Sequence, residues 1–362
     1  MTKINLVCSM FNNSGYARHG RGLAGGLGEM GADVRIDAQK IDQWERQVND
    51  FELNALGKPF DPEATTIFIS QPQYWPLMLA EKPERFIGYL VWEGDRIPSY
   101  WEKYMADERV NMIFVPSTHT FNAVKKTILN KDILNKVVVI PEGYDPSKYY
   151  SEPHGRRAFT FITNKGWARG LNDRGGIQFL IKAFCEEFSN TDDVVLKIKL
   201  NSIYNPPGWD LAKELECLKL PPKAERPPIF ITSANLDDKG LRGFYNEGDV
   251  FVTTSMAEGF NLPALEAMGC EVPVLATSFG GQADFVNNVN GWLISEGGLG
   301  YYSDEVPYED VMWFKPDIKA IQKKLRYIFE HQDEVKEKKE LALITAIKFT
   351  WRESARKVLD TL

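Results

Sequence analysis

The chain has 362 residues, which is more than one ordinary domain of ~100–200 residues and suits two. Hydrophobic residues make up 43% and charged residues 26%, a globular composition that excludes a disordered or fibrous protein. The net charge of −7 argues against sequence-independent binding of nucleic acid, which needs a clustered basic surface.

No run of residues approaches the ~18–20 apolar residues of a membrane span, and the N-terminus reads as a buried strand and not as a signal peptide. The four cysteines are scattered, which fits buried thiols in a reducing cytoplasm. The four histidines are equally dispersed, so a zinc cluster is not expected. We therefore expect a cytoplasmic protein without a transmembrane segment.

Short apolar runs alternate with helical stretches along the chain, as in α/β proteins with parallel sheets. The first half predicts strands at 4–8, 33–36, 66–70, 86–91, 112–115 and 137–140, with a helix over 16–30. The polar, turn-forming segment 149–155 predicts a linker. The second half predicts strands at 159–163, 194–200, 229–232, 250–254 and 272–276, and helices at 176–188, 239–246, 263–269, 318–331 and 334–348. We expect two doubly wound, Rossmann-like lobes, with ligands bound beyond the C-terminal ends of the strands, in the cleft between the lobes.

The stretch 20–25 reads Gly-Arg-Gly-Leu-Ala-Gly and satisfies the dinucleotide-binding pattern G-x-G-x-x-G, with Asp37 after the next strand. The context fails, because the first glycine should end the strand and Gly20 falls about ten residues later, inside a predicted helix. Glycines within a helix cost ~1 kcal/mol each relative to alanine, so we expect a packing reason such as close helix–sheet contact. The glycine at the strand-to-helix turn is Gly15, which either lets backbone amides approach a ligand or simply turns the chain.

The most informative segment is 250–275, where a buried strand leads into a polar loop that contains Glu258. Asn261 is a candidate helix N-cap, and Pro263 suits the first helical turn, which places Glu266 about one turn inside. Loop amides at a helix start favour an anion, and a carboxylate behind them can accept two vicinal hydroxyls, as a ribose offers. These residues indicate a phosphosugar or nucleotide site, the alternative being two exposed glutamates at a capped helix start.

The same segment resembles the E-x7-E signature of retaining GT-B glycosyltransferases, specifically glycosyltransferase family 4 (group 1). The resemblance continues through Gly280-Gly281 and Asp284 into 290–294, and weaker matches in the first half extend it over nearly the whole chain. It implies an α/β GT-B fold with an acceptor-side lobe at 1–150 and a nucleotide-sugar-binding lobe at 156–348. Residues 349–351, Phe-Thr-Trp, match the family's closing helix, which implies that a helix over about 349–362 crosses back to the first lobe.

By this resemblance, Glu266 would hold the ribose hydroxyls of the donor nucleotide, and Glu258 would contact the donor sugar and diphosphate. The segment after residue 229 resembles the strand on the nucleobase side. The other residues expected to bind the donor are Gly259, Phe260, Asn261, Leu262, Ser233 and Gly15.

The chain departs from the family in two places. The family places an arginine and a lysine on the loop after the first strand of the second lobe, where they neutralise the leaving diphosphate. Here Arg169 best matches the arginine and Arg174 the lysine, with Lys165 as the fallback; the alternative is a solvated loop. Many members carry a histidine after the fourth strand, and Glu93 stands in or beside that position, either orienting a hydroxyl of the acceptor or sugar or capping a helix.

The resemblance implies retaining transfer of a hexose from a UDP- or GDP-sugar to an acceptor hydroxyl. The chain contains no Asp-x-Asp, the metal motif of the other glycosyltransferase fold, so we expect neither a metal nor another cofactor. An acceptor glycan, a lipid-linked sugar and a small molecule all fit, whereas a nucleic-acid acceptor is disfavoured by the acidic charge. Front-face and double-displacement routes stay open. The alternative function is a nucleotide-sugar-binding protein or subunit without turnover.

Overall fold

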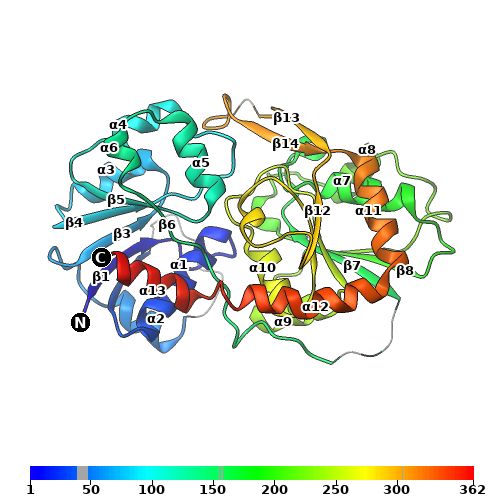
Figure 1. Ribbon diagram of the computed structural model, residues 1–362, viewed down its shortest axis with the longest axis horizontal. Coiled ribbons are helices and arrows are strands. Elements are labelled where there is room, and N and C mark those ends of the chain that lie inside the picture. The colour runs from blue at the N-terminus through cyan, green and yellow to red at the C-terminus, as the bar shows by residue number, and fades with distance from the viewer. Residues whose placement is uncertain (39–47, 154, 156–157, 304) are drawn as a thin grey trace. The chain divides into compact units, whose positions relative to one another are not determined.

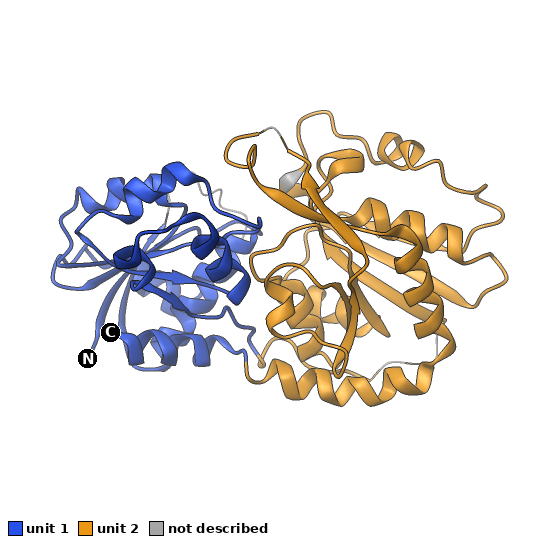
Figure 2. Cartoon of the chain, turned by 45° about the horizontal axis from the view of Figure 1, so that its top comes forward, with its two compact units in different colours: residues 1–145, 349–362 blue, residues 146–348 orange. Residues whose placement is uncertain are grey.

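The computed structural model describes residues 1–38, 48–153, 155, 158–303 and 305–362 (Figure 1). The chain forms two compact units, shown in blue and orange in Figure 2. The first comprises Met1–Asp145 and Phe349–Leu362, and the second Pro146–Lys348. Residue 154 of the segment predicted as a linker lies outside the described residues.

The first unit is built on a parallel sheet with the strand order β2-β1-β3-β4-β5-β6. Its strands are β1 (Lys3–Cys8), β2 (Asp33–Ala38), β3 (Thr65–Ile69), β4 (Arg85–Tyr89), β5 (Val110–Val115) and β6 (Val137–Val139). Each of the six predicted strands is present, with ends that shift by up to two residues.

The helices of this unit are α1 (Gly15–Glu29), α2 (Asp50–Leu56), α3 (Trp75–Leu79), α4 (Glu102–Met105), α5 (Thr118–Thr127), α6 (Lys131–Leu134) and α13 (Trp351–Thr361). Helix α13 returns from the end of the chain to pack on α1, with Ala355 and Val358 in the same buried cluster as Leu23 and Leu27 (Figure 1). The predicted return of the C-terminal helix to the first unit is confirmed.

Several glycines of α1 serve packing, as the sequence predicts. A Cβ on Gly20 would lie 2.5 Å from the carbonyl oxygen of Ser9, so glycine allows the helix to approach the end of β1. A Cβ on Gly22 would lie 2.0 Å from the Trp351 ring, and one on Gly26 would lie 2.3 Å from the Trp351 carbonyl oxygen. These two glycines therefore allow the start of α13 to pack closely against α1. Two glycines of the dinucleotide pattern, Gly20 and Gly22, therefore serve packing inside a helix.

The second unit contains a parallel sheet with the order β12-β11-β10-β7-β8-β9. Its strands are β7 (Phe159–Lys165), β8 (Val194–Leu200), β9 (Ile229–Thr232), β10 (Val250–Thr253), β11 (Val274–Thr277) and β12 (Gly291–Ile294). Its helices are α7 (Ile177–Glu187), α8 (Leu211–Cys217), α9 (Asp238–Asn246), α10 (Leu262–Gly269), α11 (Ile318–Glu330) and α12 (Gln332–Ala346). The prediction of two Rossmann-like sheets is confirmed.

An antiparallel hairpin that the sequence does not predict follows this sheet. It consists of β13 (Gly297–Tyr301) and β14 (Met312–Pro316). The Phe314 amide donates to the Met256 carbonyl (2.8 Å), and the Phe314 ring stacks on Phe279, so β14 packs against the loops that follow β10 and β11.

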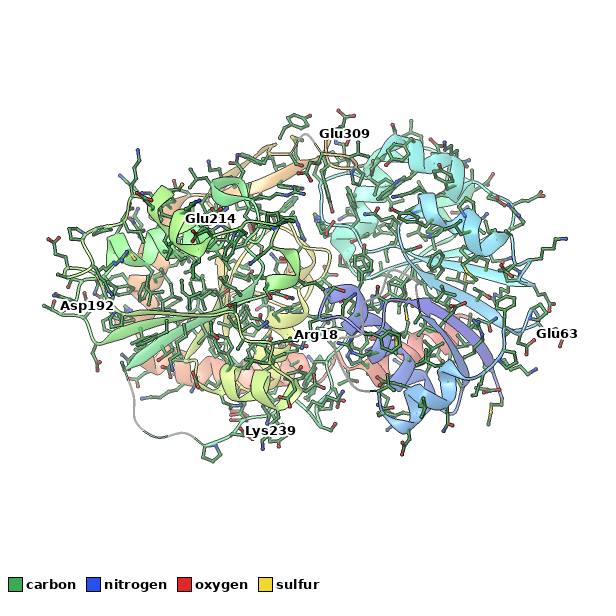
Figure 3. The ribbon with its side chains drawn as sticks, turned by 180° about the vertical axis from the view of Figure 1, so that it is seen from behind. Arg18, Glu63, Asp192, Glu214, Lys239 and Glu309 are labelled. Atoms are coloured by element: carbon green, nitrogen blue, oxygen red, sulfur yellow. The ribbon has the colours of Figure 1, made fainter. Side chains whose placement is uncertain are left out.

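Charged side chains such as Glu63, Lys239 and Glu309 are exposed and point away from the ribbon (Figure 3). None of the helices in the described part of the chain has the length and apolar character needed to cross a membrane.

Candidate active site

The candidate site lies where the chain changes direction in the second sheet. From β7 the strands proceed outward through β8 and β9, and the chain then returns to place β10 on the other side of β7. Since β7 and β10 are parallel neighbours, their C-terminal ends, Lys165 and Thr253, meet at one edge. Ligands of doubly wound sheets bind at such a switch point.

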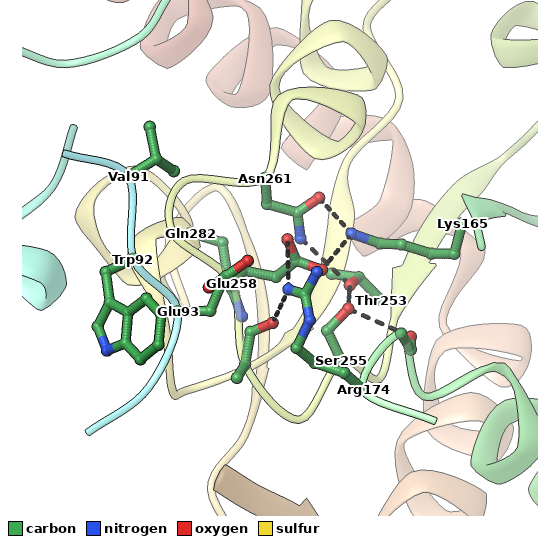
Figure 4. A network of polar contacts seen from close by, with 12 residues as sticks. Val91, Trp92, Glu93, Lys165, Arg174, Thr253, Ser255, Glu258, Asn261 and Gln282 are labelled. Atoms are coloured by element: carbon green, nitrogen blue, oxygen red, sulfur yellow. Dashed lines mark hydrogen bonds and ion pairs between the residues drawn. The ribbon is translucent and has the colours of Figure 1, made fainter. Parts of the chain in front are cut away.

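Lys165 and Glu258 form a buried ion pair at this edge (Figure 4). The Lys165 Nζ lies 2.9 Å from the Glu258 Oε1 and also donates to the Asn261 Oδ1 at 2.7 Å. Arg174 approaches the same carboxylate, with its Nη1 3.9 Å from the Glu258 Oε2 and 2.8 Å from the Ala257 carbonyl oxygen. Two cations therefore share one carboxylate, which leaves a net positive charge.

Burial and neighbouring charges shift the pKa values of both Lys165 and Glu258. Burial lowers the pKa of the Lys165 ammonium, against the attraction of Glu258. Burial alone would raise the pKa of Glu258, but the charges of Lys165 and Arg174, with hydrogen bonds from Lys165 and Ser255, hold that pKa below its usual range. At neutral pH Glu258 is therefore ionised.

The loop between β7 and α7 is shaped by Asp173. Its Oδ2 accepts from the amides of Ala168 (2.7 Å) and Arg169 (3.0 Å), and its Oδ1 accepts from the amide of Gly175 (2.7 Å). These three bonds fold the loop and fix the backbone on either side of Arg174.

Arg169 is directed elsewhere. Its guanidinium pairs with Glu305 and donates to the Ser303 Oγ at 3.3 Å, both in the segment between β13 and β14. The cation that bonds directly to Glu258 is Lys165, the fallback of the sequence reading. The structure thus brings Lys165 and Arg174 together around Glu258 and gives Arg169 partners next to the hairpin.

Glu266 lies inside α10 and is 4% exposed, with its Oε2 accepting from the Tyr245 hydroxyl at 2.8 Å. The Asn164 Nδ2 in turn donates to that hydroxyl oxygen at 3.0 Å, which fixes the direction of the Tyr245 proton toward the carboxylate. Sequence reasoning missed both partners. Tyr245 reads as an apolar residue of an amphipathic helix, and the polar pair 164–165 was not expected to continue β7.

Asn261 is the residue before α10, as expected of an N-cap, and Pro263 lies in the first turn. The Asn261 side chain, however, accepts from Lys165 through Oδ1 and donates through Nδ2 to the Thr253 Oγ1 at 3.2 Å. Thr253 is 3.0 Å from the Ser255 Oγ, which donates to the Gly175 carbonyl at 3.2 Å. The network in Figure 4 thereby links the starts of α7 and α10.

The second glycine pair supports the loop amides expected at the donor. The Gly281 amide donates to the Glu258 carbonyl at 2.8 Å, and a Cβ there would lie 2.1 Å from the Gly259 carbonyl oxygen. The segment 259–262 of the predicted site, which continues through Phe260 into Leu262 at the start of α10, is therefore packed backbone to backbone against Gly281.

The remaining predicted residues lie on other elements. Ser233 is exposed and directly follows β9, the edge strand of the second sheet. Gly15 is the first residue of α1 in the first unit, after the N-cap Ser14. Glu93, also in the first unit, follows β4, and its carbonyl oxygen lies 2.8 Å from the His119 Nε2. Among the residues that the structure describes, no group of three His, Cys, Asp or Glu side chains converges as a metal site would.

The family model of glycosyl transferases group 1 matches residues 166–304. A probable sucrose-phosphate synthase of Thermosipho melanesiensis is 26% identical over 161 residues, which is 43% of this chain and only 36% of that relative's own length. The crystal structure of sucrose-phosphate synthase from Thermosynechococcus elongatus has a TM-score of 0.68 at 16% identity and covers 100% of this chain and 98% of its own. Anabaena HepE in complex with UDP-glucose has a TM-score of 0.66 at 15% identity and covers 100% of both chains.

The matched segment contains Arg174, Glu258, Asn261, Glu266 and the second glycine pair, so the family model covers most of the site, whereas Lys165 directly precedes it. The structural likeness extends over both sheets. Residues 166–304 of the second unit match the model of the glycosyl transferases group 1, and the chain has the GT-B fold of the glycosyltransferases.

Proposed function

We propose that the protein is a retaining glycosyltransferase that moves a hexose from a UDP- or GDP-sugar to an acceptor hydroxyl. The observation that carries this proposal is the pair of cations, Lys165 and Arg174, around Glu258 at the start of α10, with the buried Glu266 inside the same helix. The two cations can neutralise a diphosphate, and the Glu266 carboxylate can accept hydrogen bonds from the hydroxyls of a ribose. The Anabaena neighbour holds UDP-glucose, which makes uridine donors the first to test.

In this proposal the donor diphosphate binds at Lys165, Arg174 and the amides that lead into α10, which is favoured by the helix dipole. As the bond from the anomeric carbon to the phosphate oxygen breaks and the bond to the acceptor oxygen forms, negative charge grows on the diphosphate. Fixed cations that meet this charge lower the barrier. They also perform the task that a divalent metal performs elsewhere, which supports metal-independent transfer. In a front-face route, an oxygen of the leaving diphosphate takes the hydroxyl proton of the acceptor glycan, lipid-linked sugar or small molecule as the new bond forms.

Glu266 is proposed to accept both ribose hydroxyls. The hydrogen bond from Tyr245 fixes the Glu266 carboxylate, so this carboxylate is already oriented before the nucleotide sugar binds. No disulfide joins the cysteines that the structure describes, which supports a cytoplasmic location beside the nucleotide-sugar supply.

The first test is calorimetric titration of the full chain, in EDTA, with UDP, GDP, ADP and TDP. We expect one of them to bind, and Glu266→Ala to weaken that binding by about tenfold or more, because two hydroxyls lose their charged acceptor. The exposed Glu247 provides a matched control, and Glu247→Ala should bind like the wild type.

Turnover is then measured with the sugar derivative of the bound nucleotide. Release of nucleoside diphosphate in EDTA, with the anomeric configuration of the product determined by NMR, tests metal independence and retention together. Binding without any transfer or donor hydrolysis would favour the non-catalytic alternative, and binding of none of the four nucleotides would reject the proposal.

A further inference from the structure

Asn261 adopts a left-handed backbone conformation, with φ 86° and ψ 61°. Glycine takes this conformation at the least cost, and asparagine is tolerated there better than most residues. The side chain is also buried, at 4% exposed. A polar side chain in that place is stable only if its hydrogen bonds are satisfied.

Two bonds orient the amide of Asn261. The Oδ1 accepts from the Lys165 ammonium at 2.7 Å, and the Nδ2 donates to the Thr253 Oγ1 at 3.2 Å. The reverse orientation would set an amide N–H against an ammonium, so the pair of partners permits one arrangement. Within the described residues, Glu258 and Asn261 take two of the three N–H groups of Lys165.

The neutrality of Asn261 matters as much as its shape. Lys165 and Arg174 contribute two positive charges and Glu258 one negative charge, so the cluster keeps a net charge of +1. An aspartate in place of Asn261 could accept the same bond from Lys165, but it would cancel that charge. The amide therefore holds the ammonium and leaves its charge available.

We propose that Asn261 is a positioning residue, whose side-chain amide holds the Lys165 ammonium toward the diphosphate of the donor without neutralising it. The inference rests on the proposed function, since it takes the bound anion to be the diphosphate of a nucleotide sugar. It assigns to Asn261 a side-chain role beyond that of its backbone amide.

Two substitutions separate shape from charge. Asn261→Gly keeps the backbone conformation and removes the side-chain amide. We expect this variant to bind the nucleoside diphosphate about three- to tenfold more weakly. Asn261→Asp keeps the shape and the acceptor but adds a negative charge, and we expect a loss of about tenfold or more that grows as the salt concentration falls. Asn288→Asp, at an exposed position of the same unit, is the charge control and should bind like the wild type.

The titrations use UDP or GDP, whichever the wild type binds, and the matching monophosphate, with melting temperatures to verify folding. A positioning role predicts a larger loss for the diphosphate than for the monophosphate, and no further effect of Asn261→Gly once Lys165 is replaced by methionine. Equal losses for both nucleotides, a loss that persists without Lys165, or unchanged binding in both folded variants would overturn the inference while the proposed function stands. Failure of the wild type to bind any nucleotide would instead reject both.

Discussion

Lys165→Met is expected to lower the free energy of unfolding by about 3 kcal/mol, because it leaves the Glu258 carboxylate buried without its closest cation. Lys165 and Glu258 side chains are 7% and 16% exposed, so water replaces little of what is lost. Arg174 is 3.9 Å from the carboxylate and compensates only in part. The measurement is urea unfolding of the full chain, followed by circular dichroism.

Two variants test this explanation. The double substitution Lys165→Met with Glu258→Gln removes both charges of the pair and should recover at least half of the lost stability, since neither member is left without its partner and Arg174, at 33% exposed, keeps contact with water. Lys197→Met makes the same change in a more exposed pair, in which Lys197 on β8 and Glu247 at the end of α9 are 29% and 51% exposed, and should cost less than about 1 kcal/mol. If Lys165→Met proved no more costly than Lys197→Met, the ion pair would not stabilise the fold.

The same pair predicts a dependence on pH. Folding lowers the pKa of Glu258 from its usual 4.5, because the charges of Lys165 and Arg174 outweigh the opposing effect of burial. As the pH falls, the unfolded chain therefore binds this proton first, and the stabilisation is fully present above about pH 4.5 and lost as the pH falls through the lower, folded value. Glu258→Gln removes the group, so its stability deficit relative to the wild type should shrink as the pH falls below about 4.5. A deficit that stays constant with pH would contradict this account.

The strands could be predicted because burial on both faces of a parallel sheet leaves continuous apolar runs. The predicted bounds of β8 and β9 agree with the structure, and the loop with Glu258 and Glu266 follows β10 as expected. The hairpin of β13 and β14 was missed, because its sequence, rich in glycines, does not alternate apolar with polar residues as a strand usually does. Its position depends on contacts with distant residues, such as the hydrogen bond from Phe314 to Met256.

The arrangement of the cations could not be read from sequence. The sequence shows three basic residues close together, but the three bonds to Asp173 that fold the loop around Arg174 cannot be read from it. Lys165 belongs to β7 itself, which runs three residues beyond its last apolar residue, Ile162. A polar strand end and a loop start look alike in sequence, and only pairing with β8 distinguishes them.

Gly176→Ala is expected to have the other large effect, because glycine is needed there for two reasons. The backbone at Gly176 has φ 76°, and a Cβ would lie 2.0 Å from the Thr254 carbonyl oxygen. The Thr254 hydroxyl donates to the Gly176 carbonyl at 2.7 Å, and the Met256 amide donates to the Arg174 carbonyl at 2.8 Å. The two site loops are thus joined just before α7, by a side-chain bond at Gly176 and a backbone bond at Arg174.

We expect Gly176→Ala to lower the free energy of unfolding by about 2–4 kcal/mol, from the left-handed backbone and the overpacking together. Nucleotide binding should weaken as well, because separating the loops moves Arg174 from Glu258. Gly243→Ala is the matched control, since a Cβ there would meet none of the described atoms within 4 Å and the residue lies inside α9. That variant should gain up to about 1 kcal/mol, so the same substitution gives opposite signs at the two positions. A stable, nucleotide-binding Gly176→Ala protein would show that the loops can separate without disturbing the cations, and the site would then not depend on their close contact.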